Sequence, residues 1–356
     1  MRRIVLPMLS LLALACSNDI DEVTLEEMTE NTLINGILHE TAKEGSAEHI
    51  SIAAPIFEER TFTIDEHAAP GSLIGTLSAK DANGDSVTYA LESDIDLDLN
   101  TATGEIRVGA QLHLDHETAE TLKFDVSAFN GKSISKRSFN LEVQDVNEVG
   151  LLTEDQAELV DYFQYLTLWQ GPYVKEVEVN RRWNEPMLLY LDGTISKEFK
   201  ATVENVIGEY NELFEDGDFS ISLTDDSEAA NSHLYFGTKQ EVESVWPDMY
   251  NIIKKGNYDG YAMTPSQNAV LISTRIWISN PIESLFKHEV GHTLGLGHSN
   301  QCEEKSIMCS QVGAKSDFSQ EEASVIRYLY HNEFSAGLSA TDIEKKLANL
   351  IVNEEN

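Results

Sequence analysis

Residues 288–298 of this 356-residue chain read HEVGHTLGLGH, and this stretch decides the fold expected for the second half of the chain. His288 and His292 are four positions apart, so both side chains lie on one face if the stretch is helical. Gly295 tolerates a positive φ, which lets a helix end and the chain turn back sharply. The spacing therefore predicts a helix and a tight turn that brings the third histidine to the other two.

Three neutral imidazole nitrogens, with one position left open for water, are a ligand set of catalytic zinc. His288, His292 and His298 are accordingly candidate Zn²⁺ ligands. The ion would lower the pKa of a bound water and polarise a substrate carbonyl. Glu289 is a candidate general base, which would take the proton and pass it to the leaving amine. The stretch thus predicts a zinc hydrolase acting on peptide bonds of a protein or peptide substrate.

This long motif resembles that of the metzincin metallopeptidases. The resemblance implies an α+β catalytic domain over residues 176–335, with the zinc ligands and the base given above. These enzymes carry a methionine turn under the metal, and the Ser-Ile-Met tripeptide that ends at Met308 fits it. Ser299 and the segment 318–330 resemble the matrixin branch, although Cys309 stands where matrixins have a tyrosine.

Cys302 and Cys309 flank the expected methionine turn. In an exported protein we expect two thiols this close in sequence to form a disulfide, which would pin the loop that holds Met308. Two free thiols are one alternative. Cys309 as an additional zinc ligand is another, and it conflicts with a three-histidine set that leaves only a water position.

In the resembled family, substrate lies extended along an edge strand above the active-site helix. Main-chain hydrogen bonds then supply affinity and side-chain pockets supply specificity. We expect this rim strand at Gly260, Tyr261, Ala262 and Met263, with its partner strand at 269–273.

The segment before the motif predicts the remaining elements of this domain. A buried strand is expected at 186–191, and Ser196 is a plausible N-cap for a long amphipathic helix after it. Further strands are expected at 219–223 and 233–236, and the zinc-ligand helix from about residue 281.

The first half of the chain has a different pattern. Between residues 55 and 148, short alternating apolar runs are separated by turn residues, which predicts an all-β sandwich. The stretch resembles a cadherin repeat in PIF at 55–57, GSLIGTLSAKDANGD at 71–85, LDHE at 114–117 and QDVNE at 144–148.

The resemblance to cadherins implies Ca²⁺ binding, because Ca²⁺ prefers several oxygen ligands. Carried over position by position, the candidate Ca²⁺ ligands are Glu66, Asp115, Glu117, Asp145 and Asn147. No second cadherin repeat follows to supply the other half of such a site. A calcium-free spacer is therefore the open alternative.

The N-terminal stretch predicts an export signal. Residues 1–15, MRRIVLPMLSLLALA, combine two arginines with an apolar run too short to span a bilayer. With Cys16 after them they resemble a bacterial lipoprotein signal, which implies lipidation of Cys16 and anchoring at the bacterial outer membrane or cell surface. A simple secretory signal is the alternative. Residues 16–54 are polar and acidic and are interpreted as a flexible stalk.

The charge balance limits the partners. Lys and Arg number 25 against 61 Asp and Glu, a formal net charge of −36. This argues against nucleic acid, because phosphate binding needs a basic patch. It also argues against docking on an anionic membrane, so the lipid anchor would be the only membrane contact. We expect a monomer.

The expected fold is multidomain: an all-β cadherin-like sandwich, a connecting helix at 149–175, an α+β metzincin-type zinc metallopeptidase domain and a C-terminal helical tail at 336–356. The expected function is a zinc-dependent endopeptidase of extracellular proteins or peptides. The alternative is a cell-surface adhesion or peptide-binding protein with a non-catalytic metallopeptidase-like domain. A zinc amidase is a third interpretation, which the long motif and the methionine turn disfavour.

Overall fold

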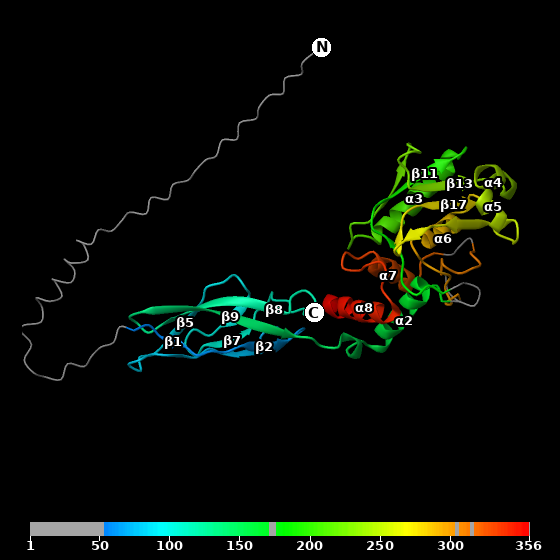
Figure 1. The fold of residues 1–356 in the computed structure, drawn as a ribbon. Coiled ribbons are helices and arrows are strands. Elements are labelled where there is room, and N and C mark those ends of the chain that lie inside the picture. The colour runs from blue at the N-terminus through cyan, green and yellow to red at the C-terminus, as the bar shows by residue number, and fades with distance from the viewer. Residues whose placement is uncertain (1–52, 171–175, 303–305, 314–316, 356) are drawn as a thin grey trace, which may run out of the picture.

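The computed structural model describes residues 53–170, 176–302, 306–313 and 317–355 (Figure 1). The expected signal peptide, Cys16 and nearly all of the expected stalk lie outside these ranges. Two bodies follow one another along the chain, and the C-terminal helix lies between them. No helix in the described ranges is long and apolar enough to cross a membrane.

The first body is a cadherin-like β-sandwich, as expected. One sheet has the strand order β2-β9-β8-β5, the other has β3-β7-β6, and β1 pairs with β4. Side chains alternate between the two faces of a strand, so every second residue of β9 from Phe139 on points into the core, where Phe62 and Phe124 meet it. The strands are β1 (Ile56–Phe57), β2 (Phe62–Asp65), β3 (Leu73–Thr76), β4 (Ala79–Lys80), β5 (Thr88–Leu91), β6 (Leu97–Leu99), β7 (Glu105–Val108), β8 (Thr121–Phe129) and β9 (Ile134–Gln144).

The second body is built on a sheet of order β12-β11-β13-β17-β14. The first four of these strands are parallel, and β14 is antiparallel at the edge. Its elements are η1 (Glu148–Gly150), α2 (Glu154–Thr167), β10 (Arg182–Trp183), β11 (Met187–Asp192), α3 (Lys197–Glu212), β12 (Ile221–Thr224), β13 (Ser232–Phe236), α4 (Lys239–Val245), α5 (Pro247–Ile253), β14 (Gly260–Met263), β15 (Ser266–Gln267), β16 (Val270–Leu271), β17 (Thr274–Ile278), α6 (Glu283–Thr293), α7 (Gln320–Leu329) and α8 (Ala340–Glu355).

Helices cover both faces of this sheet. Ile276 and Ile278 of β17 point into the main core with α3 and α6. Trp277, between them, points to the other face and packs against α4 and α5. The Ser196 hydroxyl accepts a hydrogen bond from the Phe199 N–H and caps α3, as the sequence indicates.

The prediction that the rim strand pairs with residues 269–273 is wrong. β14 pairs with β17, and residues 269–273 contain β16, which pairs with β10 and β15. The physical reason is local: Asn268 and Ala269 have φ of 51° and 66°, which closes a two-residue hairpin between β15 and β16. The chain after this hairpin then returns to the sheet as β17.

The helices at the two ends of the second body belong to its core. The expected connecting helix, α2, buries Val160, Phe163 and Leu166 in the same cluster as the α3 and α6 side chains. The expected tail helix, α8, buries Ile343 and Leu347 there as well. Both helices are amphipathic, so each must cover an apolar face. The second body therefore extends beyond residues 176–335 at both ends.

Candidate metal centre and its surroundings

The three histidines of the motif converge. His288 and His292 are on α6, which ends at Thr293, and Gly295 follows with a φ of +102°. The Nε2 atom of His292 lies 3.0 Å from that of His288 and 3.2 Å from that of His298. Nitrogens about 2.0–2.1 Å from one tetrahedral ion lie about 3.4 Å apart, so this spacing fits a single Zn²⁺.

Backbone carbonyls fix the orientation of two of these rings. His288 Nδ1 lies 2.7 Å from the Ile307 carbonyl oxygen, and His292 Nδ1 lies 2.9 Å from that of Leu296. A ring that donates from Nδ1 keeps the Nε2 lone pair for a metal. Burial lowers the pKa of His288 to about 4, and it also lowers the pKa values of His292 and His298. The rings are therefore neutral at pH 7, as metal ligation requires.

Glu289 is buried beside the ligands. Its Oε2 atom has no hydrogen-bond partner among the described residues. Burial raises the pKa of this carboxyl to about 8, because the charged form is poorly solvated there. A cation at the histidines would favour the charged form again. The carboxylate of this residue, which directly follows His288 on α6, thus has a free acceptor atom, as a general base needs.

The expected rim strand passes over this carboxyl. β14 is the edge strand of the sheet and contacts α6. A Cβ on Gly260 would lie 2.9 Å from both Cδ and Cγ of Glu289, so glycine is needed for the close approach. Tyr261, Ala262 and Met263 continue the strand away from this point, each half-buried. The free edge of β14 is therefore close to the candidate base.

The expected methionine turn lies against the ligand set. Met308 is fully buried, and its carbonyl oxygen accepts a hydrogen bond of 2.8 Å from the N–H of Ser299, the residue after the third histidine. The carboxylate of Glu322, also fully buried, accepts hydrogen bonds from the Ser306 hydroxyl and from the N–H groups of Ile307 and Met308. The sequence indicates a capping box for Glu322, which is present, but not this bond to the turn.

Cys302 and Cys309 are joined by a disulfide. It bridges the residues on either side of the turn that ends at Met308. Residues 303–305, inside this loop, lie outside the described residues.

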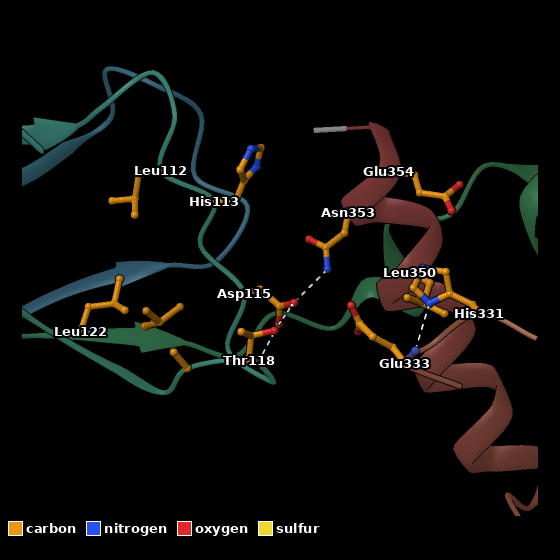
Figure 2. A pocket seen from close by; sticks show the side chains of 12 residues that line it. Leu112, His113, Asp115, Thr118, Leu122, His331, Glu333, Leu350, Asn353 and Glu354 are labelled. Atoms are coloured by element: carbon orange, nitrogen blue, oxygen red, sulfur yellow. Dashed lines mark hydrogen bonds between the residues drawn. The ribbon is translucent and has the colours of Figure 1, made fainter. Parts of the chain in front are cut away.

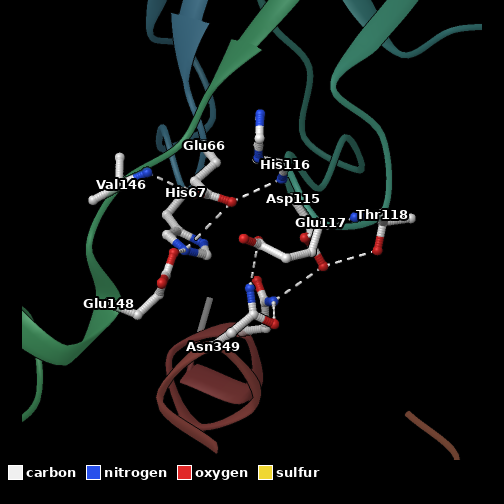
Figure 3. Close-up of polar contacts among 10 residues, drawn as sticks. Glu66, His67, Asp115, His116, Glu117, Thr118, Val146, Glu148 and Asn349 are labelled. Atoms are coloured by element: carbon white, nitrogen blue, oxygen red, sulfur yellow. Dashed lines mark hydrogen bonds and ion pairs between the residues drawn. The ribbon is translucent and has the colours of Figure 1, made fainter. Parts of the chain in front are cut away.

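Three of the five candidate calcium ligands also converge, at the end of the β-sandwich (Figure 3). Ligand atoms of Glu66, Asp115 and Glu117 lie within 4.8 Å of one another. Burial raises the pKa of Glu117, and the charges of Glu66, Asp115 and Asp145 add to this. Asn147 is the N-cap residue of η1, directly after the sandwich. The donor set is rich in carboxylate oxygen and fits a hard cation such as Ca²⁺.

Helix α8 meets this acidic cluster. The Asn349 carboxamide donates a hydrogen bond of 2.9 Å to Glu117, and Asn353 donates one of 3.2 Å to Asp115. Figure 2 shows loops of the sandwich and α8 on opposite sides of a cavity of about 390 Å³ next to these contacts. Helix α8 of the second body therefore covers part of this cluster.

Sequence reasoning missed several of these residues. His67 has no signal in the sequence, but its ring is buried and lies 3.3 Å from the Glu148 carboxylate. Asn349 and Asn353 carry no local signal, because their partners are 232 and 238 residues away. Their spacing of four indicates only that the two side chains share one face of α8.

Comparison with known proteins finds cadherins. No family model matches the chain. Cadherin-17 of the mouse (Mus musculus) is 28% identical over 137 residues, covering 36% of this chain and 17% of the relative. Cadherin-17 of the rat (Rattus norvegicus) is 28% identical over 125 residues, covering 33% and 15%. Part of this chain is similar to cadherins. The chain spans about a sixth of the length of these curated relatives.

Solved structures of cadherin repeats also match. Human protocadherin-24 EC1-2 is 25% identical with a TM-score of 0.25, covering 27% of this chain and 45% of that one. The third cadherin domain of human protocadherin 7 is 23% identical with a TM-score of 0.23, covering 30% and 96%. These similarities concern about a third of the chain. The interpretation of the histidine cluster rests on the geometry and burial of the cluster's own side chains.

Proposed function

We propose that the chain is a zinc-dependent endopeptidase. The observation that carries the proposal is the convergence of three neutral imidazole Nε2 atoms beside a buried carboxyl whose Oε2 has no partner in the described structure. His288, His292 and His298 would hold the ion. Zinc there would polarise the scissile carbonyl and lower the pKa of a water.

Residues of the chain would bind the peptide and transfer the proton. A peptide would add as an antiparallel strand to the free edge of β14, whose N–H and C=O groups align its main chain. This pairing would hold the scissile bond over Gly260 and Glu289. Glu289 would take a proton from the attacking water on Oε2 and deliver it to the leaving amine. The buried setting keeps other waters from competing for this carboxylate.

The cadherin similarity favours a second function, adhesion or peptide binding at the cell surface, with the second body as a holder rather than a catalyst. It also supports Ca²⁺ as a cofactor of the sandwich end. The N-terminal sequence supports an exported, lipid-anchored protein that meets extracellular substrates.

One experiment separates the two functions. The purified chain and a Glu289→Gln variant are loaded with zinc and incubated with a mixed peptide library, and products are read by mass spectrometry. We expect one zinc in each protein and cleavage that falls about 10²–10⁴-fold in the variant. Bound zinc without cleavage in the parent would reject the endopeptidase and favour the binding function. Failure to bind zinc would reject both the ligand assignment and the reaction.

A further inference from the structure

The turn that carries the third histidine is held by helix α2. Three hydrogen bonds reach it from this helix and the residues just after it. The Tyr162 hydroxyl lies 2.8 Å from Ser299 Oγ. The N–H of Gly297 donates to the Leu166 carbonyl over 2.7 Å. The third bond, also 2.7 Å, runs from the indole Nε1–H of Trp169 to the carbonyl of Gly295.

Two of these bonds, those of Tyr162 and of Gly297, are shielded from water, and the bond of Trp169 is partly buried. Tyr162 is 3% exposed, Leu166 is fully buried and Ser299 is 8% exposed. Polar bonds in such surroundings are stronger than on a surface, and an unpaired partner there is costly. The Trp169 ring also lies 6.2 Å from the ring of His292, centroid to centroid. The contact therefore reaches both the turn and one of the helical ligands.

The backbone of Trp169 is in an unusual conformation. Its φ is +56°, in the left-handed region that residues with a side chain seldom adopt. Trp169 directly follows Leu168, the C-cap of α2, and the N–H of Gln170 donates to the Tyr165 carbonyl over 3.0 Å, so this conformation closes the end of the helix. The chain therefore turns at Trp169, whose indole donates to the Gly295 carbonyl of the 295–299 turn.

The three ligands differ in how they are supported. Two of them are on one helix, whose own hydrogen bonds fix them relative to each other. The third is on a turn. The methionine turn supports that turn from one side, through the bond between Ser299 N–H and the Met308 carbonyl. Helix α2 supports it from a segment 126 to 137 residues earlier in the chain.

We propose that Tyr162 and Trp169 are positioning residues for the metal centre: they hold the 295–299 turn so that His298 is presented to the ion before the ion arrives. This inference rests on the proposed zinc site. Presenting the ligand in advance removes the cost of ordering the turn on binding, so the metal binds more tightly. Helix α2, which precedes the sheet in the chain, would then contribute to zinc binding.

The test uses the full chain and the variants Tyr162→Phe, Trp169→Phe and Ser299→Ala. The matched control is Tyr165→Phe, which removes a hydroxyl from the same helix where the ring packs against the core. Zinc affinity is measured by competition with a chelator, the Co²⁺-loaded protein gives an absorption spectrum of the ligand set, and hydrogen exchange of the 295–299 amides is followed without metal.

We expect each variant to bind zinc about two- to tenfold more weakly, the range of one buried hydrogen bond. The pair Tyr162→Phe and Ser299→Ala should not add, because both remove the same bond. The Co²⁺ spectrum should change and exchange at Gly297 should speed up, whereas the control should match the parent.

Parent-like affinity, spectrum and exchange in all three variants would overturn the inference and leave α2 as packing alone. A parent that binds no zinc, with faster exchange in the variants, would instead reject the proposed function while the hold of α2 on the turn stands.

Discussion

The backbone of Gly260 crosses the carboxyl of Glu289 so closely that no side chain fits between them. An edge strand and a helix meet here, and under the proposed function this contact would set the height of the substrate strand above the candidate base. The approach involves Cγ and Cδ of Glu289 as well as its tip, so the side chain cannot yield by rotating its carboxyl alone.

Gly260→Ala should displace Glu289 and slow peptide cleavage at least about tenfold while zinc still binds, since removing a general base costs about 10²–10⁴-fold. Gly208→Ala on α3 is the matched control, because a Cβ there meets nothing within 4 Å. Steady-state kinetics and zinc stoichiometry check this. Unchanged kcat in Gly260→Ala would show that the close approach has no part in the reaction.

Glu322→Gln should loosen the methionine turn. The carboxylate accepts three hydrogen bonds from residues 306–308, and an amide cannot accept all of them. We expect the free energy of unfolding to fall by about 2–4 kcal/mol, because hydrogen bonds to buried charged groups are among the stronger ones. Urea unfolding measures this, with the exposed neighbour Glu321→Gln as control. Equal losses in the two variants would contradict the role given to Glu322.

The ionisation of Asp248 should make the free energy of unfolding depend on pH. Hydrogen bonds from Arg275 lower the pKa of Asp248 to about 2, below its usual 3.8. The folded state therefore holds this proton less tightly than the unfolded state, and the contribution is complete above about pH 5 and lost as pH falls toward 2. Urea unfolding of the parent and Asp248→Asn between pH 2 and 6 should converge at the acid end.

The size of this effect will be small, because Asp248 is largely exposed and solvent screens the pair. The exposed Asp225→Asn serves as control and should track the parent at every pH. A constant difference between the parent and Asp248→Asn across the range would mean that the Arg275 contact does not act through the charge.

Calcium should stabilise the chain. The pKa of Glu117 is raised by burial and by neighbouring carboxylates, so the cluster repels itself and a bound cation would relieve this. We expect millimolar Ca²⁺ to raise Tm and EGTA to reverse the rise, by the mass action of a ligand that binds the folded state. Glu117→Gln should weaken the response, whereas Asp98→Asn, an exposed acid elsewhere on the sandwich, should keep it. A Tm that does not change on addition of calcium would support the interpretation of the sandwich as a calcium-free spacer.

The local elements follow from the sequence because they depend on neighbours in the chain. A spacing of four places His288 and His292 on one helix face, and Gly295 ends that helix with the positive φ expected of it. The alternation around Phe139 predicts the sandwich for the same reason. None of these features needs a partner from another part of the chain.

The tertiary structure decided what stands next to these elements. The rim strand could not be paired from sequence, because the hairpin at Asn268 and Ala269 diverts the adjacent residues and leaves β17 as the partner. The bonds from Tyr162 to Ser299 and from Asn349 to Glu117 join residues 137 and 232 positions apart. Such contacts are selected by how amphipathic faces pack against one another, and a pattern of spacings within one segment carries no information about which distant segment will cover it.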